Sequence, residues 1–106
     1  MLALEFHPLV EADLTEAAEW YERQQTGVGE RFAAEAHEAL HNLTGEALLY
    51  TVRFDDIRRM NLPTFPYGVF YFIERDAVVV LAVLHGARDN AGRTGEKANH
   101  IRLKAS

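Results

Sequence analysis

The chain has 106 residues, 48% of them hydrophobic and 25% charged, which fits one globular domain (residues 1–106) with a single modest core. It has no cysteine, which excludes a disulfide framework and a thiolate metal site, and its net charge of −5 argues against general nucleic-acid binding. No apolar run is long enough to span a bilayer and no signal peptide is evident, so we expect a cytoplasmic protein without membrane association.

Charge is distributed unevenly along the chain. Residues 1–50 hold two basic and ten acidic side chains, a net charge of −8, whereas residues 51–106 hold nine basic and six acidic ones, a net charge of +3. Such a division indicates either two faces with different partners or two ordinary solvated surfaces.

The first half of the chain predicts a strand followed by two helices. "LALEFH" (residues 2–7) alternates as a half-buried strand, and Pro8 suits the first turn of a helix that "TGVG" (26–29) ends. Trp20 lies off the apolar stripe of this helix, so we expect it to contact a different surface. A second helix is predicted from about Val28 to Leu43, antiparallel to the first.

The second helix contains "HEALH" (residues 37–41), which matches the H-E-x-x-H pattern of zinc hydrolases. Helical periodicity places His37 and His41 on the polar side, facing water and not a cleft. The longer protease pattern needs Gly and His where this chain has Thr44 and Ala47. We therefore predict a solvated helix face, with no metal and no other cofactor.

The second half predicts a connector and then three strands. Residues 46–56 are interpreted as a connector in which Leu48, Leu49 and Tyr50 are buried anchors. The strands that follow are short and rich in β-branched and aromatic residues: "IRRMNL", "YGVFYFIE" and "AVVVLAVLH". The order β-α-α-β-β-β indicates an α+β fold in which a helical hairpin packs against a curved sheet.

The last of these strands is apolar on both faces. Strict alternation would divide it into two sets: Val78, Val80, Ala82 and Leu84 on one face, and Val79, Leu81 and Val83 on the other. Because the helical hairpin can cover only one face, we expect the polar C-terminal tail (about 89–106) or a partner to cover the other.

A set of residues in a fixed order between about residues 4 and 88 resembles the RelE/ParE superfamily of bacterial type II toxins. The likeness is strongest to its ParE-like plasmid-stabilisation branch. The matching residues are Phe6, Pro8, Asp13, Leu14, Trp20, Tyr21, Gly27, Gly29, Phe32, Arg58, Arg59, Phe65, Pro66, Tyr67, Tyr71, His85 and Arg88.

This resemblance implies a toxin that a cognate antitoxin neutralises in a hetero-oligomer, by wrapping its C-terminal segment around the toxin. Trp20, Phe70 and Phe72 are then candidate antitoxin contacts. Two activities are known in the superfamily: RelE-like members cut mRNA on the ribosome, whereas ParE-like members poison DNA gyrase without being nucleases. A third possibility is an inactive relative that only binds antitoxin.

Four residues are candidates for contact with the target: Arg58, Arg59, His85 and Arg88. In the nuclease interpretation, His85, Arg59 and Arg88 lie at the scissile phosphate, since RNA cleavage needs clustered cations and an acid–base group. Strand alternation puts Arg58 and Arg59 on opposite faces, so only one of them is expected on the functional side. Arg58 or Arg59 can also be a solvated edge charge, and His85 a group that only hydrogen-bonds to the backbone.

Two glycines depart from the nuclease pattern. Gly68 stands where many nucleases of the superfamily carry a phosphate-facing arginine, and Gly86 stands where some carry a tyrosine. No tyrosine occurs after Tyr71. These departures favour a ParE-like inhibitor of DNA gyrase that acts by protein–protein contact over a ribonuclease that acts on the ribosome and mRNA.

Overall fold

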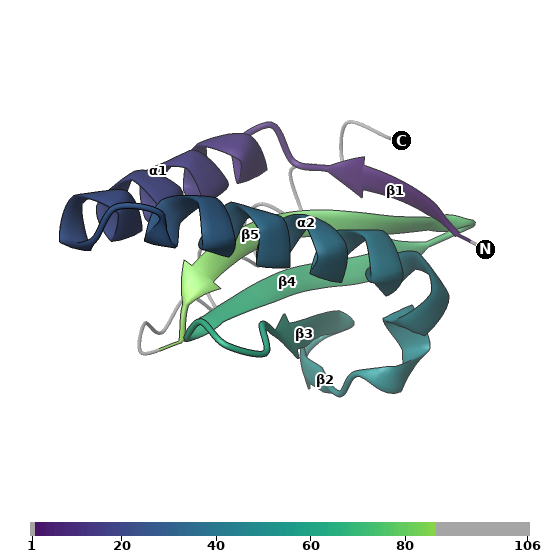
Figure 1. Ribbon diagram of the computed structural model, residues 1–106. Coiled ribbons are helices and arrows are strands. Elements are labelled where there is room, and N and C mark those ends of the chain that lie inside the picture. Colours follow the sequence, from purple (N-terminus) through teal and green to yellow (C-terminus); the bar gives the residue numbers. More distant parts are fainter. Residues whose placement is uncertain (1, 87–106) are drawn as a thin grey trace.

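The computed structural model describes residues 2–86 and has an α+β fold, in which two helices cover one face of a five-stranded sheet (Figure 1). The sheet order is β1-β5-β4-β3-β2, with β1 parallel to β5 and the other pairs antiparallel. The elements in chain order are β1 (Ala3–Phe6), α1 (Val10–Gln24), α2 (Val28–Glu46), η1 (Ala47–Leu49), β2 (Val52–Phe54), β3 (Ile57–Asn61), β4 (Tyr67–Glu74) and β5 (Ala77–His85).

The predicted break between the helices is a tight turn built on two glycines. Gly27 has a φ of 91°, which a residue with a side chain rarely adopts. A Cβ on Gly29 would collide with the backbone oxygen of Ala18, so α1 and α2 approach closely here. The Glu22 carboxylate accepts hydrogen bonds from the N–H groups of Gly27 and Gly29, at 2.9 and 3.0 Å, and so fixes the hairpin.

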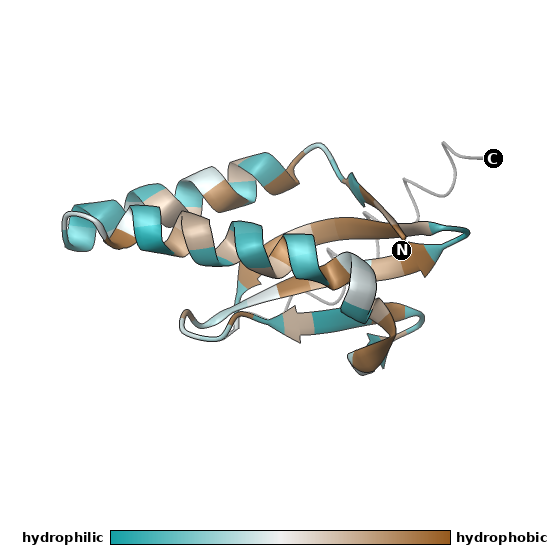
Figure 2. Cartoon of the chain, turned by 45° about the vertical axis from the view of Figure 1, so that its right-hand side comes forward, coloured by the Kyte–Doolittle hydropathy of each residue, from teal (hydrophilic) through white to brown (hydrophobic). Residues whose placement is uncertain are grey.

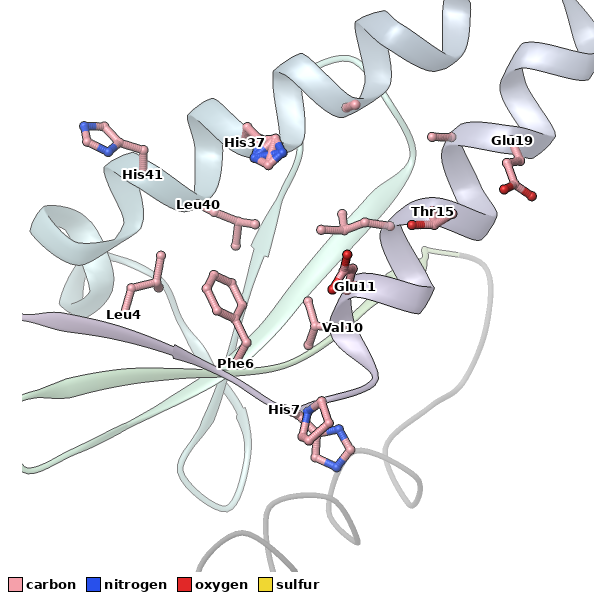
Figure 3. A pocket seen from close by; sticks show the side chains of 14 residues that line it. Leu4, Phe6, His7, Val10, Glu11, Thr15, Glu19, His37, Leu40 and His41 are labelled. Carbon is pink, nitrogen blue, oxygen red and sulfur yellow. The ribbon is translucent and has the colours of Figure 1, made fainter.

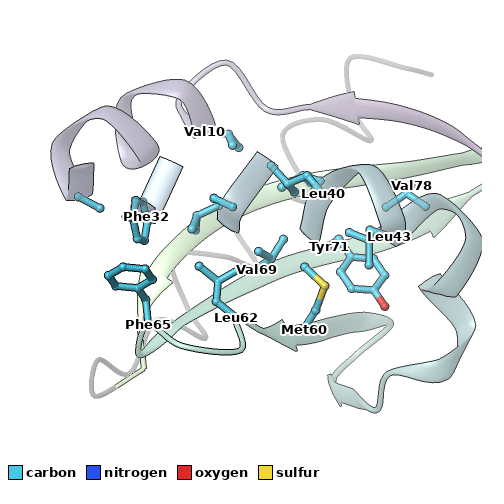
Figure 4. Close-up of a cluster of buried hydrophobic side chains, with 14 of the residues drawn as sticks. Val10, Phe32, Leu40, Leu43, Met60, Leu62, Phe65, Val69, Tyr71 and Val78 are labelled. Atoms are coloured by element: carbon cyan, nitrogen blue, oxygen red, sulfur yellow. The ribbon is translucent and has the colours of Figure 1, made fainter. Parts of the chain in front are cut away.

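The main core lies between the helices and the sheet (Figure 4). Phe32 is fully buried, and its ring lies 5.1–5.5 Å from the rings of Tyr21, Phe65 and Tyr67. Both helices turn apolar residues toward the sheet and polar residues away from it (Figure 2), as the predicted stripes require. The Glu35 carboxylate accepts hydrogen bonds from the backbone N–H groups of Thr64 and Phe65, which ties α2 to the loop before β4. Burial raises the pKa of Glu35, but the Thr64 side chain, these two N–H groups and the charge of Arg31 together lower it below its ordinary value.

The connector between α2 and β3 differs from the prediction. Helix α2 continues through Gly45 to Glu46, and Leu48 and Leu49 are 73% and 78% exposed, so the prediction that they are buried anchors is wrong. Ala47 is the buried residue instead, and its carbonyl accepts a hydrogen bond from the buried Tyr71 hydroxyl at 2.5 Å. The connector also contributes an unpredicted edge strand, β2.

A β-bulge corrects the predicted faces of β5. Phe70 pairs with Ala82 and Tyr71 with Val80, so Leu81 is an extra residue that reverses the alternation beyond it. The helix-covered face therefore carries Val78, Val80 and Val83. The opposite face, here called the far face, carries a second apolar cluster: Ile57, Phe70, Phe72, Ala77, Val79, Leu81, Ala82 and Leu84.

No helix within residues 2–86 is long and apolar enough to cross a membrane. The predicted role of the tail as a cover for the far face lies outside the described residues.

Candidate functional site

An open groove of about 710 Å³ runs between α1, α2 and β1 (Figure 3). Its apolar walls come from Leu4 and Phe6 on β1, Leu14 on α1 and Leu40 on α2. Phe6 is 48% exposed, whereas the strand pattern predicted a buried side chain. The prediction is wrong because Phe6 lines a groove that is open to solvent and that the two helices do not fill.

The two histidines of "HEALH" lie at the rim of this groove. His37 and His41 are exposed, as predicted, but they border a cleft, contrary to the prediction. Helical periodicity predicts which face of one helix a side chain lies on. It cannot predict a groove that forms between this helix and a neighbouring strand. Within residues 2–86 no three histidine or acidic side chains are grouped as metal ligands.

The groove adjoins an open edge of the sheet. β1 is the last strand on its side of the sheet, and among residues 2–86 no strand other than β5 pairs with it, so this part of the chain leaves its outer edge open. An apolar groove beside an open strand edge is the kind of surface that takes an extended or helical segment of a partner.

Arg58 lies on the helix-covered face, where it holds the connector to the sheet. Its Nη1 donates a hydrogen bond to the Tyr50 carbonyl at 2.5 Å, close to the bond that joins Tyr71 to Ala47. Arg58 is partly buried and its guanidinium bonds to backbone, so it links the connector to the sheet, and its contact with a target stays a prediction.

Arg59 lies on the far face, in a position that we call the arginine seat, formed by Asn61, Gly68, Phe70 and Gly86. Its Nε donates a hydrogen bond to Asn61 Oδ1 at 2.8 Å, and its guanidinium carbon lies 5.4 Å from the centre of the Phe70 ring. A Cβ on Gly68 would collide with Arg59 Nε, and one on Gly86 would lie 2.9 Å from an Nη atom. The side chain thus crosses β4 and reaches the end of β5.

The opposite placement of the two arginines confirms the prediction from strand alternation. The sequence carries a signal for the seat at Gly68, in addition to the departure of this residue from the nuclease pattern. A glycine inside a strand marks a close approach by another group, and at Gly68 that group is the Arg59 side chain.

His85 and Trp20 border a separate hollow on the helix-covered side, between α1 and the end of β5. The His85 ring packs edge-on against Tyr67, with ring centres 5.4 Å apart. Trp20 is 48% exposed and contacts the Tyr21 ring edge-on, so it lies off the stripe as predicted. Because Gly86 and Leu84 face the far side, His85 and Arg59 lie on opposite faces of the sheet.

The predicted site residues therefore do not form one cluster. Phe70 and Phe72 are buried in the far-face cluster, away from Trp20, so these three candidate antitoxin contacts do not share a surface. Arg88 lies outside the described residues, and its part in a site stays a prediction.

Comparison with known proteins identifies the family. The family model described as "ParE toxin of type II toxin-antitoxin system, parDE" matches residues 4–90. The chain belongs to this family. The fold of the chain is also similar to that of a solved structure titled "Chromosomal ParDE TA system from P. aeruginosa". The two chains share 16% sequence identity, the TM-score is 0.71, and the match covers 80% of this chain and 96% of that one. No curated protein has a sequence similar enough to count as a match. The protein is thus a ParE-type toxin of a type II toxin–antitoxin system, with the predicted α+β fold.

Proposed function

We propose that this ParE-type toxin inhibits DNA gyrase in the cytoplasm by protein–protein contact and thereby arrests growth. The observation that supports contact over RNA cleavage is the separation of His85 from Arg59. An endoribonuclease needs an acid–base group and a cation at the same phosphate, within hydrogen-bonding distance of the reacting atoms. Here the sheet itself stands between the two side chains. Arg59, in contrast, is positioned to contact a target from the far face.

We further propose that a cognate antitoxin neutralises the toxin by placing an apolar segment in the groove between α1, α2 and β1. Phe6 and Leu4 offer apolar surface there, and the open edge of β1 offers backbone hydrogen bonds. Burial of half-exposed aromatic surface is the type of contact that contributes most to protein–protein affinity. The result would be a toxin–antitoxin hetero-oligomer.

The mechanism is tested by pulse labelling after the toxin is induced alone in bacteria. Under the proposal, thymidine incorporation falls within minutes and methionine incorporation falls later. A methionine fall that comes first would replace gyrase inhibition with the ribosome-dependent mRNA endonuclease. If neither label falls while the protein is soluble, the chain is an inactive relative that retains antitoxin binding.

Antitoxin docking is tested by Phe6→Asp, with Leu49→Asp as a matched control. Leu49 is exposed on η1, outside the groove, so its substitution changes charge and hydrophobicity elsewhere. We expect Phe6→Asp to weaken capture by the antitoxin at least about tenfold and to leave gyrase inhibition intact, since it places a charge in an apolar contact. Equal effects of the two substitutions would contradict docking in the groove.

A further inference from the structure

We propose that the arginine seat is a carboxylate-binding site, in which Arg59 binds an acidic side chain of the toxin's protein target. This inference rests on the proposed function and names the chemistry of the contact. It starts from the electrostatic state of Arg59, which differs from that of an ordinary surface arginine.

Arg59 is a partly buried cation that lacks a carboxylate partner in the described chain. Its hydrogen bond goes to the neutral Asn61 amide, and its ring contact goes to Phe70. Burial and the positive charge of Arg53 on β2 both lower the pKa of Arg59, although an arginine stays charged at neutral pH. A half-buried charge beside a like charge is stabilised by an anion, so this position favours a negatively charged ligand.

The seat also presents the guanidinium in a defined orientation. Asn61 Oδ1 accepts the hydrogen bond of Nε, and the missing Cβ atoms of Gly68 and Gly86 leave room for the side chain across β4, with one Nη atom at the end of β5. The Nη pair can therefore donate two parallel hydrogen bonds, the geometry that a carboxylate accepts. A lysine in the same position would supply a point charge without this fork.

The net negative charge of the protein favours a carboxylate on a protein over a phosphate on a nucleic acid. The chain has a net charge of −5, and residues 2–86 alone carry six basic and fourteen acidic side chains, a net of −8. A nucleic acid would meet this negative field over a large area, whereas a single acidic side chain needs only a local positive charge, which Arg59 and the nearby Arg53 supply.

Two glycine substitutions distinguish an effect on the position of Arg59 in the seat from the general effect of replacing a glycine by alanine. Gly68→Ala places a methyl group where Arg59 Nε lies, so it moves the guanidinium and keeps its charge. Gly45→Ala is the matched control, because a Cβ there meets nothing within 4 Å. Arg59→Gln removes the charge and keeps a side chain of similar length, so the site can still be tested if Gly68→Ala does not fold.

The direct experiment measures binding of a labelled oligo-glutamate peptide and of an oligothymidylate of matched charge to the full-length chain by fluorescence anisotropy. We expect the peptide to bind, and its affinity to fall about tenfold in Arg59→Gln and in Gly68→Ala, with no change in Gly45→Ala. Tighter binding of the oligothymidylate would overturn the inference in favour of a nucleic-acid phosphate. Absence of peptide binding to the wild-type protein, or equal binding by Arg59→Gln, would also overturn it.

The same variants in a gyrase supercoiling assay distinguish the failure of this inference from the failure of the proposed function. If wild-type toxin inhibits gyrase and Arg59→Gln inhibits it equally, the seat is not the contact and gyrase remains the target. If wild-type toxin does not inhibit gyrase but binds oligo-glutamate through Arg59, the carboxylate site stands and the proposed target is wrong.

Discussion

Arg58 and Arg59 are neighbours in β3, yet their guanidinium groups lie on opposite faces of the sheet and have different partners. Arg58 bonds to the Tyr50 carbonyl and joins the connector to the helix-covered face. Arg59 lies over two glycines on the far face, with an amide and an aromatic ring as partners. Of these two identical side chains, one position apart, Arg58 links parts of the fold and Arg59 is a candidate contact for a target. A basic residue in a strand can be interpreted only when its face and its partners are known.

The largest expected effect is a loss of folding stability on the helix-covered face, compared with the groove wall. Phe32→Ala removes a ring that packs against Tyr21, Phe65 and Tyr67, so we expect the free energy of unfolding to fall by about 3–5 kcal/mol. Phe6→Ala, at the half-exposed groove position, is the control and should cost less than about 1 kcal/mol. Urea unfolding measures both. Similar losses would mean that the groove wall is part of the core.

The second prediction compares the two arginines directly. Arg58→Ala removes a charged hydrogen bond to a backbone carbonyl, and we expect a loss of about 1.5–3 kcal/mol in the free energy of unfolding. Arg59→Ala removes a charge without a carboxylate partner among the described residues, and we expect a change within about 0.5 kcal/mol.

Toxicity on induction should show the reverse order, lost in Arg59→Ala and retained in Arg58→Ala at a temperature where both are folded. Equal stability losses would remove the distinction between the two faces.

The third prediction concerns the pH dependence of the Tyr71–Ala47 contact beside Arg58. Burial raises the pKa of Tyr71 from 10.0 to about 12. Its stabilising contribution is therefore fully present below about pH 10, and it is lost as the pH rises through about 12, because the unfolded chain releases the proton first. The pKa values of Tyr21 and Tyr50 are also raised by burial, so they add to the alkaline loss.

Urea midpoints measured between about pH 8 and pH 11 should fall less steeply above about pH 10 in Tyr71→Phe than in the wild type. The variant should also be less stable at neutral pH, since the Ala47 carbonyl loses its donor. Parallel pH profiles would show that Tyr71 ionises as freely in the folded as in the unfolded chain.

The smallest expected effect is stabilising. Gly45 lies inside α2 with space around its Cα, so Gly45→Ala should raise the free energy of unfolding by about 0.5–1 kcal/mol. Thermal or urea unfolding detects a change of this size. A loss of stability would mean that the end of α2 needs the flexibility of glycine before η1.

The amino-acid sequence by itself determined the order of the elements apart from η1 and β2, the hairpin break at Gly27 and Gly29, the opposite faces of Arg58 and Arg59, and the position of Trp20 off the apolar stripe. Each of these depends on a local property, namely periodicity, a positive φ or strand alternation, which acts over a few neighbouring residues. The family resemblance added a fold that the structure confirms.

Tertiary structure decided what depends on contacts between distant segments. The bulge at Leu81 reversed the faces of β5, because register is set by pairing with β4 and not by the pattern of β5 alone. Leu48 and Leu49 are exposed because η1 buries Ala47 instead. Gly68 acquires a role only when Arg59, on the neighbouring strand, lies across it. Such contacts join residues that are far apart or on different strands, and no local pattern records them.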